Sequence, residues 1–429
     1  LERASIFSER KVNISLSLAK NTSMLLLMNI AKMILPLITL PYLTRVLTVD
    51  CFGLVAYVKA VMQYMQIFVD YGFMISGTQD IALARSDNDQ LNAEVSNILL
   101  ARLFLSVIGL MILVVMAFIL PILKGNFLFV LLSYLVVVLT CFLFDYLFRG
   151  LEKMEVITKR FVVMRGIAVL LTFFFVKSDS DILWIPILDI LGSIIAVILV
   201  FIQLHKMKIM LKFHSSNDIL KKIKDSTVVF LNTVAVTAFM ALNTIVIGIY
   251  LPIKEVAFWS LSLQIISAGQ AFYTPIIEGI YPRMIISKDF NIIQKVLKIF
   301  IPIIILGCIF TYFAAPIMVQ IIGGIQYIDA TSTLQALIPV LFFGFTTMLF
   351  GWPTLGVLGK AKDVTFCTMI TAFLQILGLI VLVDMGKLTI LNISWLRGIT
   401  EFINTCLRLL YIWAYRYKGD IDCGKWTRN

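Results

Sequence analysis

The stretch VSNILLARLFLSVIGLMILVVMAFIL, residues 95–120, is apolar except for the small polar residues Ser96, Asn97 and Ser106 and one charged side chain, Arg102. At 1.5 Å per residue, a helix of this length is long enough to cross the roughly 30 Å hydrocarbon core of a bilayer. In lipid every backbone polar group must be paired internally, so only helices or a closed barrel can span. The run lacks the alternation of a barrel strand. It therefore predicts a transmembrane helix.

The composition indicates that the rest of the 429-residue chain follows this pattern. Hydrophobic residues make up 60%, charged residues only 14%, and mean hydropathy is +0.97, which is more apolar surface than a soluble fold of this length can hide. The six cysteines are scattered singly and neither histidine has metal-ligand spacing, so we expect no disulfide framework, metal or cofactor. No phosphate-binding loop or catalytic motif is present, and we expect a protein that is not an enzyme.

Apolar runs between polar breaks predict about twelve spanning helices in an all-α fold. They lie at residues 19–42, 52–78, 95–120, 127–148, 161–176, 182–204, 226–250, 256–281, 295–319, 333–356, 364–383 and 389–415. A weak repeat at an offset of about 204 residues, for example Gln66 over Gln270, relates the halves in parallel orientation because six helices separate them. We therefore predict two six-helix lobes, residues 1–204 and 226–429, with a central cavity between them and a basic linker at 205–225.

The distribution of Lys and Arg predicts the orientation. If the N-terminus is cytoplasmic, 26 of the 36 basic residues fall on the cytoplasmic side, five on the opposite side and five inside spans. Such a bias is typical of the positive-inside rule, so both termini are expected in the cytoplasm. The net charge of +11 is then a membrane feature and not a sign of nucleic-acid binding. The basic linker is expected to lie on anionic headgroups.

Polar residues inside the spans cluster on helical faces, and a charge at the centre of a span costs roughly 2.5–3.5 kcal/mol. Lys59, Gln63, Gln66 and Asp70 form one stripe, and Arg397, Glu401, Asn404 and Arg408 form another. Further cavity-lining candidates are Asn29, Lys32, Gln264, Gln270 and Glu278.

Two interpretations of the charged stripes stay open. The side chains of Arg397 and Glu401 either meet a ligand or form an i, i+4 ion pair without one. Asp145 and Asp189 stand singly and suit structural hydrogen bonds, whereas Arg102 and Arg408 lie near cytoplasmic span ends where long side chains can snorkel. Fixed positive charge in a low-dielectric cavity favours an anionic cargo such as a diphosphate.

The segments LPLITLPYLTRVLTVDCFGLVAY (35–57), VDYGFMISGTQDIALAR (69–85) and FRGLEKMEVITKR (148–160) resemble the O-antigen flippases, the Wzx-type polysaccharide-biosynthesis branch of the multidrug, oligosaccharidyl-lipid and polysaccharide exporter superfamily. The resemblance implies transfer of an undecaprenyl-diphosphate-linked repeat unit across the bacterial inner membrane. Lys32, Lys59 and Arg397 would meet the diphosphate or acidic sugars, and Asp70, Glu278 and Glu401 would couple transport to an ion gradient. Thr48, Asp145 and Arg149 depart from the family pattern, so no role is carried over to the end of the fourth span.

Two other functions are considered. A multidrug or cation antiporter of the same superfamily would be expected to present carboxylates in its cavity. A membrane polymerase or acyltransferase would be expected to need a large loop outside the membrane, and the outer loops here are short. The repeat suggests function as a monomer, with a polysaccharide polymerase and a chain-length regulator as candidate partners. The sugar identity, the coupling ion and the resting conformation are not fixed by the sequence.

Overall fold

The computed structural model describes residues 2–211, 216–287 and 289–417, with the side chains of residues 2–22, 216, 217, 232, 235–241, 282, 286 and 417 excepted. The chain forms two compact units. Unit 1 comprises Leu1–Leu47 and Val58–Val234, and unit 2 comprises Thr48–Tyr57 and Ala235–Asn429. The boundary therefore falls inside a helix, and the basic stretch 205–225 lies within unit 1. Residues 212–215 of that stretch, and the predicted C-terminal tail from 418, are outside the described residues.

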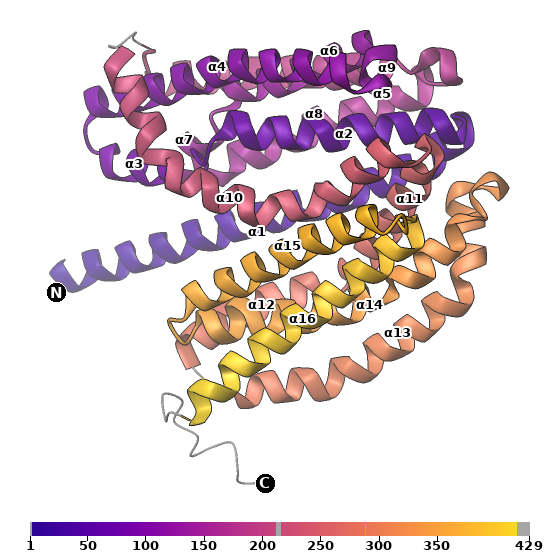
Figure 1. The fold of residues 1–429 in the computed structure, drawn as a ribbon. Coiled ribbons are helices and arrows are strands. Elements are labelled where there is room, and N and C mark those ends of the chain that lie inside the picture. Colours follow the sequence, from indigo (N-terminus) through magenta and orange to yellow (C-terminus); the bar gives the residue numbers. More distant parts are fainter. Residues whose placement is uncertain (1, 212–215, 288, 418–429) are drawn as a thin grey trace. The chain divides into compact units, whose positions relative to one another are not determined.

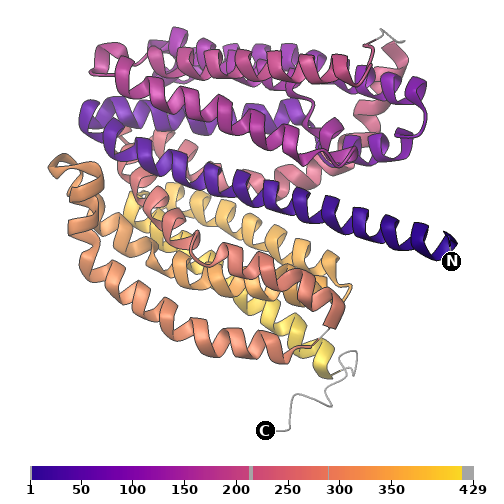
Figure 2. The ribbon, with the colours of Figure 1, turned by 180° about the vertical axis from the view of Figure 1, so that it is seen from behind.

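Unit 1 is a bundle of long helices with short connections (Figure 1). Its helix α6 packs against α9 and α4, and α1 packs against α8, which Figure 2 shows from behind. The side chain of Asp87 caps the start of α4 by accepting the backbone N–H groups of Asp89 and Gln90. In order, the elements are α1 (Glu2–Val46), α2 (Val49–Asp70), α3 (Ser76–Ala84), α4 (Asn88–Ile119), α5 (Pro121–Gly125), α6 (Phe127–Thr140), η1 (Cys141–Leu143), α7 (Asp145–Gly150), α8 (Met154–Phe175), η2 (Asp179–Asp181), α9 (Trp184–Lys206) and the first part of α10 (Ser216–Tyr250).

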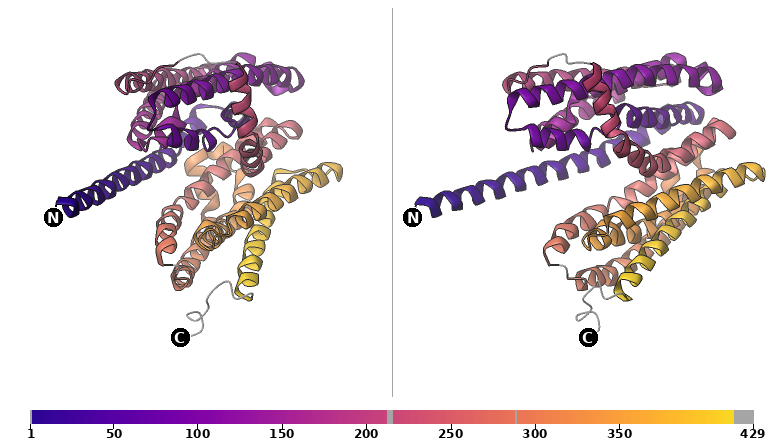
Figure 3. Two further views of the ribbon diagram at one scale, coloured as in Figure 1. Left: turned by 90° about the vertical axis from the view of Figure 1, so that its left-hand side faces the viewer. Right: turned by 60° about the vertical axis from the view of Figure 1, so that its left-hand side comes forward.

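Unit 2 is a second helical bundle, centred on α14. This helix packs against α11, α13 and α16, and α16 also packs against α15, as the two views of Figure 3 show. The first turns of α2 join this unit, where the ring of Phe52 meets that of Tyr327 edge to face at 6.0 Å. The remaining elements are α11 (Ile253–Gln270), α12 (Thr274–Ser287), α13 (Asn291–Gly323), η3 (Ile325–Tyr327), α14 (Ala330–Phe350), η4 (Gly351–Gly356), α15 (Ala361–Asp384) and α16 (Ile390–Tyr417).

The helices coincide with the predicted spans, and the expectation of an all-α membrane protein is confirmed. Helices occupy most of each of the twelve predicted ranges, and in the described residues eight segments are long and apolar enough to cross a membrane. Large apolar side chains on the outside of the helices are well exposed, such as Phe118 at 71%, Leu306 at 68% and Phe310 at 66%, as a lipid solvent allows. The protein is a multi-pass membrane protein, while the twelve-helix count and the lobe boundaries at 204 and 226 stay predictions.

Four of the predicted spans are interrupted, and they are the second, fourth, eighth and tenth. The second breaks at Tyr71 and Gly72, which have φ angles of 42° and 79°, and the fourth breaks at Phe144, with φ of 50°. The eighth breaks between α11 and α12, and the tenth changes to a π-helix, η4. The interruptions in one half recur six spans later in the other, as a parallel repeat requires. Interrupted helices in corresponding halves point to where a transporter binds its cargo.

Candidate functional site

In unit 1 the predicted stripe on α2 runs from exposed to half-buried side chains. Lys59 and Gln63 are exposed, whereas Gln66 and Asp70 are half-buried. The Gln66 amide Nε2 donates to Asp70 Oδ2 and to Thr140 Oγ1, at 2.9 Å each. These bonds join the end of α2 to the end of α6. The stripe therefore connects two of the interrupted helices through polar side chains.

Three aspartates near the stripe each pair with one arginine from another helix. Asp70 pairs with Arg102 of α4, and Asp145 pairs with Arg160 of α8. Both arginines are buried, with 4% and 3% exposure. The third pair, Asp189 with an Arg165 side chain that is 44% exposed, has an N–O distance of 2.8 Å. The structural role expected for Asp145 and Asp189 agrees with these pairs.

Arg102 differs from the sequence interpretation. Its position near a cytoplasmic span end would allow the side chain to snorkel, but the side chain is buried and turned to Asp70. The physical reason is that Asp70 ends α2 immediately before the Tyr71 and Gly72 break. A carboxylate at that depth needs a partner, and Arg102 is the cation in reach.

Three basic side chains of unit 1 that lie in or next to the predicted spans take no part in this pairing. In the described part of the chain, no carboxylate lies within 4.0 Å of the side-chain nitrogens of Lys32, Lys59 or Arg149. The Lys32 Nζ stands 5.5 Å from the centroid of the Phe161 ring, and its electrostatic neighbours include Arg149. Neither residue is balanced by an acid of its own. Unit 1 thus presents an excess of positive charge along its polar face.

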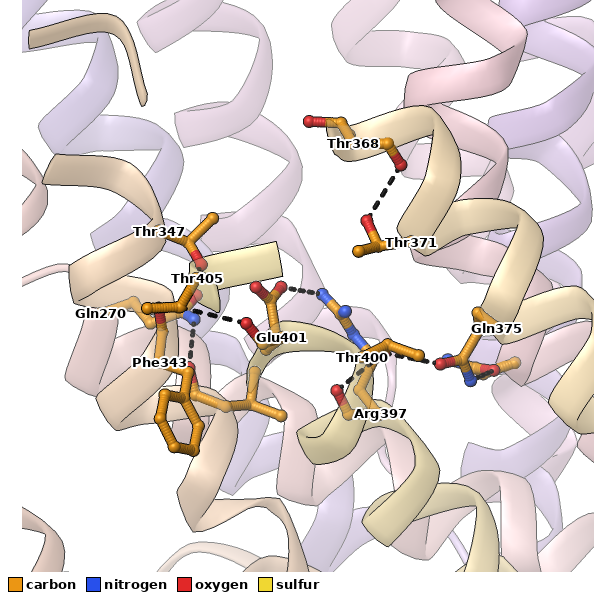
Figure 4. Close-up of polar contacts among 12 residues, drawn as sticks. Gln270, Phe343, Thr347, Thr368, Thr371, Gln375, Arg397, Thr400, Glu401 and Thr405 are labelled. Carbon is orange, nitrogen blue, oxygen red and sulfur yellow. Dashed lines mark hydrogen bonds and ion pairs between the residues drawn. The ribbon is translucent and has the colours of Figure 1, made fainter. Parts of the chain in front are cut away.

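In unit 2 the polar stripe on α16 contains an ion pair. The Arg397 Nη2 donates to Glu401 Oε1 at 2.7 Å, and both side chains are nearly buried (Figure 4). Between the two, Thr400 donates to the Gln375 Oε1 of α15 at 2.9 Å. Gln375 in turn donates to the Asn243 Oδ1 of α10 at 2.9 Å. The ion-pair alternative for Arg397 and Glu401 is the one found in this structure.

Arg408 is the second arginine that lies close enough to a span end to snorkel, and its side chain is also buried. Its guanidinium donates to the Thr347 carbonyl oxygen near the end of α14 and to Thr368 Oγ1 of α15, the latter at 3.0 Å. Helix carbonyls are left without helical partners where α14 gives way to the π-helix. A buried arginine satisfies one of them, so that Arg102, Arg160 and Arg408 each hold an interrupted helix.

The remaining candidate residues make fewer polar contacts than those described above. Asn29 in unit 1 and Glu278 in unit 2 are exposed, and Gln264 is half-buried. Gln270 Nε2 donates to the Val340 carbonyl at 3.5 Å, beside the α11 and α12 break. The Oδ1 atom of the buried Asn404 has no hydrogen-bond partner among the described residues. The predicted site residues thus fall into one set in each unit.

Sequence reasoning missed Arg102, Arg160, Gln375 and Asn243 as members of these networks. A signal was present for Arg102. It lies seven residues into its span, and Asp70 lies eight residues before the end of the preceding span, so a helical hairpin sets both at similar depth. Gln375 and Asn243 gave no such signal because 132 residues separate them. Among the described residues, no group of His, Cys, Asp and Glu could hold a metal ion.

Residues 18–288 match the family described as polysaccharide biosynthesis protein. The chain belongs to that family. Two curated relatives, both named "Putative O-antigen transporter", come from Escherichia coli (strain K12) and Shigella dysenteriae. The first is 27% identical over 92% of this chain and 97% of its own length, and the second 28% identical over 78% and 85%.

Solved structures establish the fold of this family member. An inward-facing multidrug resistance MATE family transporter of the MOP superfamily has a TM-score of 0.69 at 15% identity, covering 91% of this chain and 95% of that chain. The lipid II flippase MurJ, in an inward closed conformation, has a TM-score of 0.68 at 14% identity, covering 90% and 87%. The chain therefore has the MOP superfamily fold, and the resemblance found in the sequence is confirmed.

Proposed function

We propose that the protein is a flippase that moves undecaprenyl-diphosphate-linked polysaccharide repeat units from the cytoplasmic to the periplasmic leaflet of the bacterial inner membrane. The observation that carries this proposal is the uncompensated positive charge of Lys32, Lys59 and Arg149 in unit 1. A diphosphate carries the opposite charge, and fixed cations attract it far more strongly in a low-dielectric site than in water. Family membership and the named relatives support the same class of cargo.

The transport cycle is proposed to work by alternating access. Helices α1, α2 and α7 present the excess cations, and the paired arginines keep the interrupted helices in place. Asp70, Glu278 and Glu401 are the candidates for coupling to a proton or sodium gradient. Of these, Asp70 and Glu401 are held by arginines, so coupling through them requires their ion pairs to open. In this proposal both termini are cytoplasmic, one chain suffices, and no nucleic acid is involved.

A multidrug antiporter is the strongest competing function, because one of the solved structures with this fold is a multidrug transporter. A cationic drug needs free carboxylates, however, and in unit 1 the three aspartates of the polar face are each matched by an arginine. The remaining charge there is positive. A membrane polymerase or acyltransferase finds less support, since the relatives are named as transporters.

The test begins with deletion of the gene, followed by complementation with Lys59 variants. We expect the deletion strain to lose its long-chain surface glycan ladder on a gel and to accumulate single repeat units on lipid in the cytoplasmic leaflet. Lys59→Glu should fail to restore the ladder, whereas Lys59→Arg should restore it because the charge is kept. Lys177→Glu, at an exposed lysine just after α8 of the same unit, is the matched control and should behave as wild type.

Two results would contradict the proposal. A normal ladder in the deletion strain, in a genome without a second flippase, would remove the cargo assignment. A normal ladder with the double variant Lys32→Glu and Lys59→Glu, at wild-type protein level, would remove the role of the excess cations. Loss of drug resistance in the deletion strain would instead favour the antiporter.

A further inference from the structure

Lys222, near the start of α10, is held by two carboxylates of unit 1. Its Nζ lies 2.7 Å from Asp80 Oδ2 on α3 and 2.6 Å from Glu94 Oε2 on α4. The side chain of Lys222 is only 18% exposed. Burial lowers the pKa of Lys222, but the contacts with Asp80 and Glu94 raise it more, so the pKa is raised overall. Lys222 is therefore charged, and one cation joins three helices.

The neighbouring lysines on the same helix do not share this arrangement. Lys221 and Lys224 are exposed, and no carboxylate of the described residues lies within 4.0 Å of them. The sequence interpretation, in which the basic stretch faces lipid headgroups, suits these two. The side chain of Lys222 instead contacts carboxylates of the protein, and in this respect it differs from Lys221 and Lys224.

Further contacts with unit 1 hold the turns of α10 that follow Lys222. Ser226 Oγ lies 2.8 Å from Ser76 Oγ of α3. The ring of Phe230 stacks on that of Tyr71, with centroids 4.2 Å apart and planes at 10°. A Cβ added to Gly72 would stand 2.9 Å from the backbone nitrogen of Phe230. This half of α10 therefore covers the break between α2 and α3 so closely that the backbones of Gly72 and Phe230 are nearly in contact.

The connection that leads into α10 is anchored to unit 1 as well. The backbone N–H of Met210 donates to the Asn92 Oδ1 of α4 at 3.0 Å. Asn92 lies two residues before Glu94, so neighbouring positions on α4 hold both sides of the connection. The connection between α9 and α10 is thus fastened to α4 on both sides.

We propose that residues 218–230 of α10 are a fixed strap of unit 1, with Lys222, Asp80 and Glu94 as its ionic lock. Helix α10 continues without interruption to Tyr250, and unit 2 begins within it at Ala235. The strap and unit 1 therefore form one body, and movement between the units is taken up beyond Phe230 and not in the preceding connection. This inference rests on the proposed alternating access for its role in transport, but not for its geometry.

The first experiment fastens the strap covalently. In a chain whose six cysteines are replaced by alanine, Ser76→Cys and Ser226→Cys place two thiols where the hydroxyl oxygens are 2.8 Å apart. We expect a disulfide to form in membranes and the glycan ladder to persist at its wild-type amount. Loss of the ladder on oxidation, with recovery on addition of a reductant, would show that the strap must detach and would overturn the inference.

The second experiment tests the ionic lock by charge reversal. Lys222→Glu places three carboxylates together, so we expect loss of most of the ladder and a lower melting temperature of the purified protein. Lys224→Glu makes the same change of charge on an exposed side chain and should match wild type in both measurements. The triple variant Asp80→Lys, Glu94→Lys, Lys222→Glu restores opposite charges and should recover the ladder.

The measurements in these two experiments test the strap separately from the proposed flippase function. Equal melting temperatures and equal ladders for the Lys222 and Lys224 variants would overturn the lock, whatever the cargo. Cross-linking yield and melting temperature do not depend on transport. A deletion strain with a normal ladder would therefore refute the flippase proposal and leave the strap to be judged by those two measurements.

Discussion

Helix α8 offers two arginines, five residues apart, that differ mainly in burial. Arg160 has a side chain 4% exposed and pairs with Asp145, whereas Arg165 is 44% exposed and pairs with Asp189. Replacing Asp145 by leucine leaves a buried guanidinium without its carboxylate, which costs about 3–5 kcal/mol of unfolding free energy. The same change at Asp189 leaves a cation that still reaches solvent, and the cost is at most about 1 kcal/mol.

The assay is equilibrium unfolding of purified protein in mixed micelles, with increasing mole fraction of dodecyl sulfate. We expect Asp145→Leu to lose at least about 2 kcal/mol more than Asp189→Leu, which is the difference between the two ranges. The double variant Asp145→Leu, Arg160→Met removes both charges and should recover most of the loss. Equal losses from the two single variants would refute the reasoning, because burial would then not decide the cost.

Two further predictions concern packing and pH. Gly248→Ala should destabilise unit 2 by about 1–3 kcal/mol, because the new alanine Cβ would stand 2.2 Å from Tyr57 Cε2. Gly279→Ala, at a position with open space around it, is the control and should be neutral. Thermal unfolding of the two variants compares their stabilities. The raised pKa of Lys222 means that its stabilising effect is complete below its ordinary value of 10.5 and lost as the pH rises through the higher folded value. The melting-temperature difference between wild type and Lys222→Met should stay constant up to about pH 10 and shrink above it, and a difference that vanished by pH 8 would contradict this.

The helical ranges could be predicted from sequence because a span is a local property. A run such as 95–120 contains its own evidence, since length and hydropathy alone decide whether it can cross a bilayer. The interruptions are less local. Tyr71 and Gly72 adopt positive φ angles in a stretch with a glycine, but Phe144 does so without one, and nothing in its side chain favours that conformation.

The candidate site could be predicted only along single helices. The α2 stripe from Lys59 to Asp70 follows from helical periodicity, and periodicity also allowed for the ion pair of Arg397 and Glu401. Partners on other helices depend on which helices pack together and in what rotation. This is why the sequence allowed Arg102 to snorkel, although its side chain is buried beside Asp70.

The predicted cations differ in whether a carboxylate already pairs with them, and this difference separates the candidates for first contact with a diphosphate from the others. Arg397 was grouped with Lys32 and Lys59 as a diphosphate ligand, but it already holds Glu401 at 2.7 Å. An incoming anion would have to compete with that carboxylate in a nearly buried setting, where breaking an ion pair is costly. Lys59 is exposed and has no carboxylate of its own within reach in the described chain. The first contact with a diphosphate is therefore expected on unit 1, and Arg397 joins only if its ion pair with Glu401 opens.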